Sequence, residues 1–290
     1  MNSDLIAGMA ALVDPGAPPE VLAVRGDVVV VRVADVVLKA HEPGTDRAVL
    51  AERLRLAADP RLGGLLLAPR SATPAVVLGR AVTAWPVGTP VPQGEPEDLP
   101  MEAAGRVLAE LHRFTAADFA PPVPRAGAVP RMRRAVRELA VDTPAADLVR
   151  RAYATLPEFA EGGATLIHGD WHLGQLVRRD GYRLIDVDDL GFGDPAWDLA
   201  RPAALHAAGV LDPEAWGRLL GSYFAAGGAG VPREDPWSVL EAPARALVVQ
   251  MAARALAAAE RDGKELDEAQ ELLIEACGRI VSAHGPMARG

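Results

Sequence analysis

The amino-acid sequence predicts an α+β fold with a small, antiparallel β-rich lobe over residues 1–90 and a larger, mostly helical lobe over residues 91–290. Three observations support this fold class. Valine-rich runs come first, a stretch dense in proline and glycine follows at 86–100, and alanine-rich segments with helical spacing fill the rest. A chain of 290 residues can bury a hydrophobic core in each of two such lobes.

The β-rich lobe begins with a valine-rich stretch at 21–40, which is interrupted by Gly26-Asp27 and again by Ala34-Asp35. β-Branched runs separated by turn residues of this kind predict strands that reverse direction at each interruption. We therefore expect three short antiparallel strands joined by tight turns.

A helix is expected next, over 47–59, because Thr45 or Asp46 can cap its N-terminus and apolar residues then recur at helical spacing. Two further strands are expected at 63–70 and 75–85, which read GGLLLAPR and AVVLGRAVTAW. The small lobe should therefore hold a sheet of about five strands and one helix.

The helical lobe is first indicated by Val107, Leu108, Leu111 and Phe114, which fall on one face of a helix. Further helical segments are expected near 131–140, at 144–160, and as three alanine-rich helices over 212–285.

The composition argues against several classes of protein. The net charge of −9 disfavours nucleic-acid binding driven by charge. No apolar run reaches the roughly 18 residues of a membrane span, and the N-terminus lacks the basic region of a signal peptide. Cys277 is the single cysteine, so no internal disulfide can form, which fits a reducing compartment. We expect a cytoplasmic protein with no nucleic-acid and no membrane partner.

A polar cluster lies between two apolar runs in the stretch TLIHGDWHLGQLV, which contains His168, Asp170, His172 and Gln175. Its histidine and aspartate spacing is compatible with a dinuclear metal site that has mixed nitrogen and oxygen ligands. A metal-dependent hydrolase built on His168, Asp170, His172 and Asp186 is therefore one hypothesis for this region.

The segment after this cluster, QLVRRDGYRLID, predicts a β-hairpin that turns at Asp180-Gly181. Such a hairpin brings Gln175 close to Asp186. Carboxylate and side-chain amide oxygens suit a hard cation such as Mg²⁺, which binds together with substrate phosphates. The sequence therefore predicts a magnesium site with Gln175 and Asp186 as ligands.

The spacing of these residues is similar to that of protein-kinase catalytic loops, in which a His-x-Asp motif precedes an amide ligand and a metal-binding aspartate. Here Gln175 follows Asp170 by five residues, and Asp186 ends the next predicted strand. The similarity predicts that Asp170 accepts the proton of a substrate hydroxyl.

Lys39 is a further candidate, because this chain uses arginine almost everywhere else. Lys39 and Lys264 are the only lysines among 30 basic residues. A compact ammonium contacts phosphate oxygens differently from a planar guanidinium. Lys39 lies on the third predicted strand and Glu52 on the next predicted helix, as in the lysine–glutamate pair of kinases. We expect Lys39 and Glu52 to pair and to bind the nucleotide.

Together these segments resemble the aminoglycoside-phosphotransferase-like kinases, a small-molecule branch of the protein-kinase-like fold. The resemblance covers residues 21–205 and rests on VVLKA, Glu52, LAELH, HGDWHLGQLV and LIDVDDLGFGDPAWDLA. It implies a bilobal enzyme that binds ATP or GTP with Mg²⁺ between its lobes and phosphorylates a hydroxyl group of a small molecule. It also implies a backbone hinge at AWPVG, where Trp85 and Val87 would contact the nucleotide.

The resemblance implies supporting roles around the catalytic loop. His168 and Asp198 would brace the loop rather than react. His172 would be structural or adjacent to the substrate. Asp188 and Asp189 would contact metal or substrate, or would be solvated turn residues.

Two features depart from the pattern of the family. Gln175 stands where the family usually has asparagine, as in the maltokinase and glucosamine-kinase branch, and its amide lies about 1.5 Å further out. This favours a sugar or amino sugar as the acceptor, and the family resemblance also implies aminoglycoside-like antibiotics as candidates. Only Arg25-Gly26-Asp27 joins the first two predicted strands, so no glycine-rich loop covers the phosphates. A nucleotide-sensing pseudokinase is therefore a further alternative.

Charged residues outside these motifs are expected to be solvated. Four arginines at 131, 133, 134 and 137 indicate a solvated helix face. Acidic residues on the last two predicted helices could attract an aminated acceptor, but a solvated face is the simpler interpretation.

Overall fold

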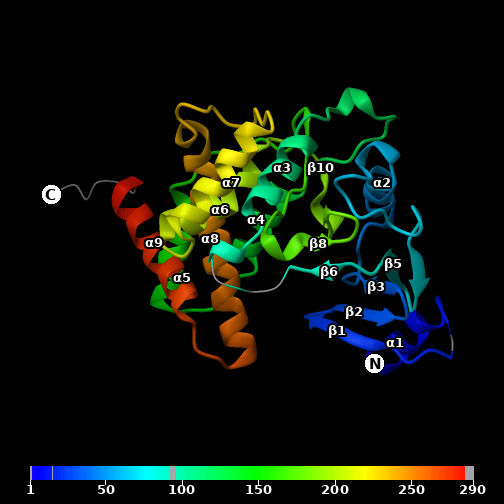
Figure 1. The fold of residues 1–290 in the computed structure, drawn as a ribbon. Helices are drawn as coiled ribbons and strands as arrows, with labels where there is room; N and C mark the ends of the chain where they lie inside the picture. The colour runs from blue at the N-terminus through cyan, green and yellow to red at the C-terminus, as the bar shows by residue number, and fades with distance from the viewer. Residues whose placement is uncertain (1, 15, 92–93, 95, 285–290) are drawn as a thin grey trace. The chain divides into compact units, whose positions relative to one another are not determined.

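The computed structural model describes residues 2–14, 16–91, 94 and 96–284. They form an α+β fold in which antiparallel strands dominate the N-terminal part and helices dominate the C-terminal part, as predicted (Figure 1). The chain divides into two compact units. The first comprises Met1–Val91, Phe119–Pro124 and Gly174–Asp188, and the second comprises Pro92–Asp118, Arg125–Leu173 and Asp189–Gly290. The predicted hairpin after Gln175 therefore belongs to the first unit, whereas the sequence-based division assigned it to residues 91–290.

A five-stranded antiparallel sheet forms the centre of the first unit. Its strands run in the order β1-β2-β3-β5-β4, with the bounds β1 Glu20–Arg25, β2 Val28–Val33, β3 Val36–Ala40, β4 Ala75–Val77 and β5 Arg80–Pro86. The three strands predicted within 21–40 are confirmed. Helix α2, Arg47–Ala57, is also confirmed, and the Asp46 carboxylate caps it by accepting bonds from its first backbone amides.

One predicted strand is wrong. Segment 63–70 contributes an isolated bridge between Leu66 and Leu184, and the fifth strand arises because segment 75–85 folds back on itself as a hairpin. The hairpin turns at Leu78 and Gly79, which adopt φ of 48° and 78°. A backbone in this left-handed region leaves the extended conformation, so the apolar run divides into β4 and β5.

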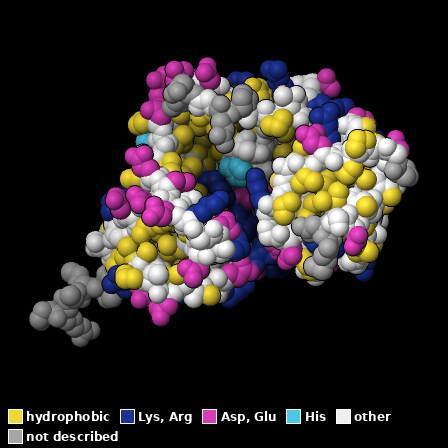
Figure 2. Space-filling model, turned by 90° about the horizontal axis from the view of Figure 1, so that it is seen from below, with side chains coloured by type: hydrophobic (Ala, Val, Ile, Leu, Met, Phe, Trp, Pro, Cys, Tyr) yellow, Lys and Arg dark blue, Asp and Glu magenta, His cyan; other side chains and the backbone are white. Residues whose placement is uncertain are grey.

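Helix α1, Asn2–Ala10, packs against the five-stranded sheet. Leu5 and Met9 are buried in one hydrophobic cluster with Val31 and Leu38 of the sheet. The edge strand β1 leaves large apolar side chains exposed, and Figure 2 shows hydrophobic side chains gathered on the surface of this unit. The apolar N-terminal segment is therefore part of the core of the first unit.

A three-stranded sheet in the first unit contains the hairpin predicted after the polar cluster. Its order is β6-β8-β9, with the bounds β6 Thr89–Pro90, β8 Leu176–Arg178 and β9 Tyr182–Leu184. Asp180 and Gly181 have φ of 51° and 104°, so the hairpin turns where the sequence predicts. Short 3₁₀ turns at Leu173–Gln175 and Val187–Asp189 flank it.

The second unit is built mainly from helices. They are α3 Met101–Leu111, α4 Ala128–Arg137, α5 Pro144–Ala154, α6 Ala196–Ala208, α7 Pro213–Ala225, α8 Trp237–Asp262 and α9 Glu268–His284, with a small sheet of β7 Thr165–Ile167 and β10 Gly191–Gly193. Helix α3 packs against α7, and the long helix α8 contacts α4, α5, α6 and α9. The helix expected at 144–160 ends at Ala154, because Pro157 disfavours a helical conformation at the residue before it. In the described part of the chain, no helix is both long and apolar enough for a membrane span.

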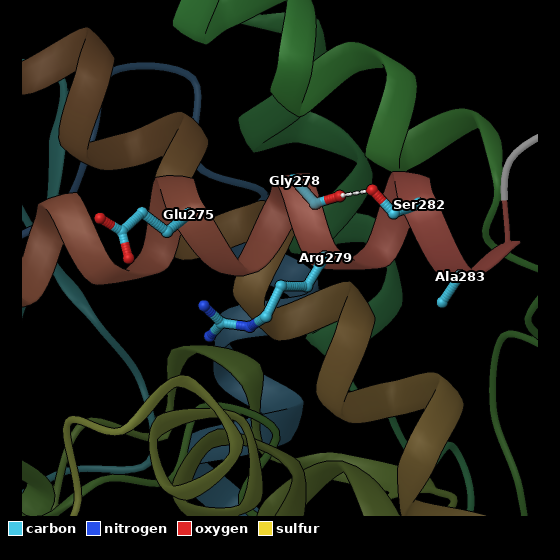
Figure 3. A pocket seen from close by; sticks show the side chains of 5 residues that line it. All are labelled: Glu275, Gly278, Arg279, Ser282 and Ala283. Carbon is cyan, nitrogen blue, oxygen red and sulfur yellow. Dashed lines mark hydrogen bonds between the residues drawn. The ribbon is translucent and has the colours of Figure 1, made fainter.

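A shallow cavity of about 740 Å³ lies along α9 in the second unit (Figure 3). It is lined by Glu275, Gly278, Arg279, Ser282 and Ala283. The Ser282 hydroxyl donates to the Gly278 carbonyl at 3.0 Å, so it is bonded within its own helix. The lining contains none of the residues that the sequence predicts for the site.

Candidate active site

Lys39 lies at the centre of a charged cluster in the first unit. Alternate residues of β3 are buried in the sheet core, which directs Lys39 to the other face of the strand. Its Nζ lies 2.5 Å from Asp186 Oδ1 and 2.7 Å from Asp188 Oδ2. One ammonium therefore bridges two carboxylates.

Burial and ion pairing act in opposite directions on this cluster. Burial alone lowers the pKa of Lys39, but the Asp188 and Asp186 carboxylates outweigh it and raise that pKa above its ordinary value. Burial raises the pKa of Asp188, but Lys39 and His41 outweigh it and hold that pKa below its usual range. Lys39 and Asp188 are therefore both charged at neutral pH.

Two residues that sequence reasoning missed hold Asp188 in place. His41 Nδ1 lies 3.3 Å from Asp188 Oδ2, and His41 Nε2 lies 3.0 Å from the Thr83 hydroxyl oxygen. Arg53, on α2, donates to the carbonyl oxygen of Asp188. The available signal for His41 was its position two residues after Lys39, because alternate residues of an extended segment share one face.

The hairpin brings Gln175 and Asp186 together, as predicted. Gln175 is buried, and its Nε2 donates to Asp186 Oδ2 at 3.2 Å. The backbone amide of Ile185 donates to the Gln175 carbonyl at 2.9 Å, which fixes the spacing of the two segments. Asp186 has a φ of 62°, a left-handed conformation that is uncommon for residues other than glycine and often occurs at functional sites.

The oxygen atoms of this cluster fit a hard divalent cation. Asp186 and Asp188 supply two carboxylates, and the Lys39 ammonium bridges them. Rotation of the Gln175 amide would add a third oxygen donor beside Asp186. Donor sets made of oxygen alone suit Mg²⁺.

The histidine-based metal site of the hydrolase hypothesis is not formed. Within the described ranges, no group of three or more His, Cys, Asp or Glu side chains is arranged to hold a metal ion. His168 is fully buried, and its Nδ1 accepts a bond from the Asp170 amide at 3.4 Å. This nitrogen supports the loop conformation rather than a metal.

Asp170 lies in the second unit, where two arginines contact it. Arg131 Nη1 and Arg201 Nη2 each lie 2.5 Å from Asp170 Oδ1. Burial raises the pKa of Asp170, but Arg131 and Arg201 outweigh it and keep that pKa below its usual range. The carboxylate is therefore ionised, which is the state that a proton acceptor needs.

The prediction that Arg131 lies on a solvated helix face is wrong. Ala128, Arg131 and Ala135 follow one another at helical spacing on α4, and all three are buried. Arg131 contacts two further groups besides Asp170. Its Nε lies 2.9 Å from Asp189 Oδ2, and its Nη2 donates to the Gly169 carbonyl at 3.1 Å. Asp189 is thus an ion-pair partner rather than a solvated turn residue.

Asp198, in the first turn of α6, is fully buried and binds the loop that precedes Asp170. Its carboxylate accepts bonds from the backbone amides of His168 at 2.7 Å and Gly169 at 2.8 Å. His112 Nε2 lies 3.2 Å from the same carboxylate. These bonds support the bracing role that the family resemblance implies for Asp198.

The predicted pair of Lys39 with Glu52 is not formed. Among the described residues, the carboxylates bonded to Lys39 are those of Asp186 and Asp188, whereas Glu52 lies half-buried on α2. The two aspartates after β9 already satisfy the ammonium, and α2 reaches the cluster through Arg53 instead.

The predicted hinge residues have partners inside the first unit. Trp85 Nε1 donates to the Thr83 hydroxyl oxygen at 3.0 Å. The Val87 amide donates to the Asp35 carbonyl at 3.1 Å, and the Val87 carbonyl accepts a bond from Arg179 Nη1 at 2.6 Å. Nucleotide binding at Val87 would therefore require exchange of these bonds, and it stays a prediction.

His172 lies half-buried two residues after Asp170, and its charge contributes to lowering the pKa of that aspartate. This placement agrees with a residue adjacent to the substrate or to the loop, but it assigns His172 no part in the chemistry.

Comparison with known protein families identifies the chain. The model described as "Phosphotransferase enzyme family" (APH) matches residues 25–237, a range that includes Lys39, Asp170 and Asp186. The chain belongs to the phosphotransferase enzyme family. It is therefore a kinase of small molecules that transfers a phosphoryl group to a hydroxyl, as the sequence predicts.

Solved structures show the same fold. A choline/ethanolamine kinase family protein from Mesorhizobium loti is 18% identical, with a TM-score of 0.61 over 95% of this chain and 92% of that chain. A thermostable mutant of aminoglycoside phosphotransferase APH(4)-Ia is 12% identical, with a TM-score of 0.61 over 92% of this chain and 94% of that chain. Macrolide 2'-phosphotransferase MphH from Brachybacterium faecium is 20% identical, with a TM-score of 0.50 over 99% of this chain and 100% of that chain. A comparison with curated proteins gave no match.

Proposed function

We propose that this phosphotransferase uses ATP and Mg²⁺ to phosphorylate a hydroxyl group of a sugar or a similar polyhydroxylated small molecule. The observation that carries the proposal is the Lys39 bridge to Asp186 and Asp188. A lysine beside two carboxylates can bind phosphate oxygens while the carboxylates hold a divalent cation. In the same fold, a structure of APH(4)-Ia contains AMP-PNP and hygromycin B, and spectinomycin phosphotransferase contains ADP and spectinomycin.

The proposed reaction is a single displacement at phosphorus. The acceptor hydroxyl oxygen forms a bond to the γ-phosphorus, the bond from that phosphorus to the β,γ-bridging oxygen breaks, and ADP leaves. Asp170 takes the hydroxyl proton, and Lys39 neutralises charge on the phosphates. Mg²⁺ bound by Asp186, Asp188 and Gln175 would supply further positive charge to the phosphate oxygens.

The proposed timing of proton transfer rests on the low basicity of a carboxylate relative to an alkoxide. Arg131 and Arg201 keep the carboxylate ionised but also make it a weak base. A weak base cannot deprotonate an alcohol before the transfer begins. Asp170 therefore orients the hydroxyl and receives its proton late, as the bond to phosphorus forms, which fits a loose transition state.

The test is nucleotide consumption with a panel of acceptors. ADP formation should require both Mg²⁺ and a hydroxyl compound, with plain sugars, amino sugars, aminoglycosides and peptide antibiotics as the panel and GTP as the alternative donor. Asp170→Asn should abolish transfer, because an amide cannot accept the proton. Full phosphoryl transfer by Asp170→Asn would remove this residue from the mechanism.

One observation favours a second function, that of a nucleotide sensor without transfer. A tight turn joins β1 to β2, with Gly26 at a φ of 57°, in place of a glycine-rich loop. A sensor would bind MgATP and hydrolyse it slowly, and no acceptor would accelerate ADP formation. Acceleration by any hydroxyl compound in the panel would exclude this alternative.

A further inference from the structure

Two arginines contact the Asp170 carboxylate. The guanidiniums of Arg131 and Arg201 contact its carboxylate and lower its pKa. Arg131 also pairs with Asp189, whereas Arg201 has Asp170 as its ion-pair partner. Two guanidiniums therefore surround the proton acceptor, and one of them is shared with Asp189.

Arg254 adds a third guanidinium to this region. It lies on α8, which packs against α4 and α6, the helices that carry Arg131 and Arg201. Burial lowers the pKa of Arg254 and repulsion by Arg131 lowers it further, whereas attraction by Asp170 and Asp189 opposes this decrease. Within the described ranges Arg254 has no hydrogen bond and no ion-pair partner, and its side chain is exposed to solvent. Arg254 is thus a cation that Asp170 and Asp189 attract without an ion pair among the described residues.

Polar groups near these arginines also lack protein partners. Gln250 lies one turn before Arg254 on the same face of α8, is fully buried, and bonds through neither of its amide atoms within the described residues. Arg201 Nε and Trp171 Nε1 are likewise buried without an acceptor there. A buried donor without an acceptor is costly, so these groups indicate a region that binds a polar ligand.

The balance of charge indicates the sign of that ligand. Three guanidiniums, from Arg131, Arg201 and Arg254, face two carboxylates, from Asp170 and Asp189, so one positive charge is in excess. An aminated acceptor would bring a further cation to this region and be repelled. An acidic group would instead be attracted, and a guanidinium can bind a carboxylate or a phosphate through two parallel hydrogen bonds.

We propose that the acceptor carries an acidic group, a carboxylate or a phosphate ester, in addition to the hydroxyl that is phosphorylated, and that Arg254 binds this group. The inference rests on the proposed phosphotransferase function and narrows its acceptor to hydroxylated acids. Arg201 then has two roles, as a contact of Asp170 and as a neighbour of the acidic group.

The first test compares acceptors that share a ring and differ in charge. Glucose, glucosamine, glucuronate and a glucose phosphate ester, together with open-chain hydroxy acids, are compared by kcat/KM for ADP formation. An acidic compound should exceed its neutral and aminated counterparts by at least about tenfold, the effect of one charge-assisted contact. Comparison of kcat/KM for glucuronate and for the glucose phosphate ester shows whether the site prefers a carboxylate or a phosphate. A neutral or aminated compound as the best acceptor would overturn the proposal.

The second test changes the charge at Arg254. Arg254→Gln should raise the KM for the best acidic acceptor about ten- to hundredfold, with a smaller effect on kcat, and Arg254→Glu should raise it further. The KM for the neutral counterpart should move far less, which a merely structural role of Arg254 would not produce. Arg261→Gln is the matched control, because Arg261 is exposed on the same helix and pairs with Asp262. An equal change for neutral and acidic acceptors in Arg254→Gln would refute the assignment.

Measurement of MgATP binding by titration calorimetry distinguishes failure of the proposed phosphotransferase function from failure of the inference about the acidic acceptor. If the protein does not bind MgATP and no acceptor is phosphorylated, the proposed function fails, and this inference fails with it. If MgATP binds but only neutral or aminated compounds are phosphorylated, the inference alone fails. Bound MgATP without transfer to any acidic acceptor would also count against the inference.

Discussion

The ammonium of Lys39 lies 2.5 Å from the Asp186 carboxylate, although 147 positions separate the two residues in the sequence. Lys39 is one of only two lysines in the chain, and the other, Lys264, is exposed beyond the end of α8. The Lys39 ammonium bridges both carboxylates, which would otherwise repel each other. Substitution of Lys39 is therefore the most direct way to test the site.

Lys39→Met should lower kcat/KM for ATP by at least about a hundredfold, because it removes a cation from the phosphates. Lys39→Arg should also have a low kcat/KM for ATP, since a planar guanidinium does not replace a compact ammonium between two carboxylates. Steady-state kinetics at saturating Mg²⁺ would measure both variants. Lys264→Met is the matched control and should behave as the wild type. Wild-type activity in Lys39→Met would mean that the cluster does not bind nucleotide.

Glu52→Gln and Asp188→Asn should have unequal effects. Asp188 contacts Lys39 and His41 in the structure, whereas Glu52 does not pair with Lys39 among the described residues. We expect Asp188→Asn to lower kcat at limiting Mg²⁺ by more than about tenfold and Glu52→Gln to change it less. Magnesium titrations of both variants would check this. A greater loss in Glu52→Gln would indicate that Lys39 changes its partner when nucleotide binds.

Asp170→Asn should abolish phosphoryl transfer while MgATP still binds, because the residues that we propose to contact the nucleotide belong to the first unit and Asp170 to the second. We expect a loss of at least about a hundredfold in kcat. Asp180→Asn is the matched control, since Asp180 is an exposed residue at the hairpin turn and asparagine tolerates its φ of 51°. Calorimetry with MgATP and a transfer assay separate binding from chemistry. If Asp170→Asn also stopped binding nucleotide, the division of roles between the units would be wrong.

The sequence predicted what depends on local pattern. Valine-rich runs with turn residues predicted β1 to β3, and the Asp180-Gly181 turn predicted the hairpin that joins Gln175 to Asp186. These features follow from neighbouring residues, so no knowledge of the remaining chain was needed. The single strand predicted over 75–85 was wrong, because this apolar run contains a turn at Leu78 and Gly79 that its composition does not reveal.

The partners of charged side chains could not be predicted in this way. The expected partner of Lys39 was Glu52, but carboxylates from the segment after β9 are closer. Arg131 was expected to be solvated because it belongs to an arginine-rich run, yet helical register turns it inward to Asp170. Ion pairs between segments far apart in sequence depend on packing that periodicity does not reveal.

Asp198→Ala should destabilise the fold, because it removes a fully buried carboxylate and leaves the amides of His168 and Gly169 without an acceptor. We expect the free energy of unfolding to fall by about 3–5 kcal/mol. Urea unfolding followed by tryptophan fluorescence would measure it. Asp262→Ala, at an exposed site on α8, is the control and should change stability by less than about 0.5 kcal/mol. Equal stability of Asp198→Ala and wild type would show that the loop does not depend on this carboxylate.

Arg201→Gln should shift the acid limb of the pH profile. Burial raises the pKa of Asp170, and Arg131 and Arg201 together outweigh burial and lower it. Protonated Asp170 cannot accept a proton, so kcat/KM falls as the pH drops through its pKa. Removal of one guanidinium leaves burial less opposed, which raises the pKa and moves the acid limb to higher pH. Arg201→Lys keeps the charge and should leave the limb closer to its wild-type position. A profile of Arg201→Gln whose acid limb coincides with that of the wild type would show that Asp170 does not limit the rate at low pH.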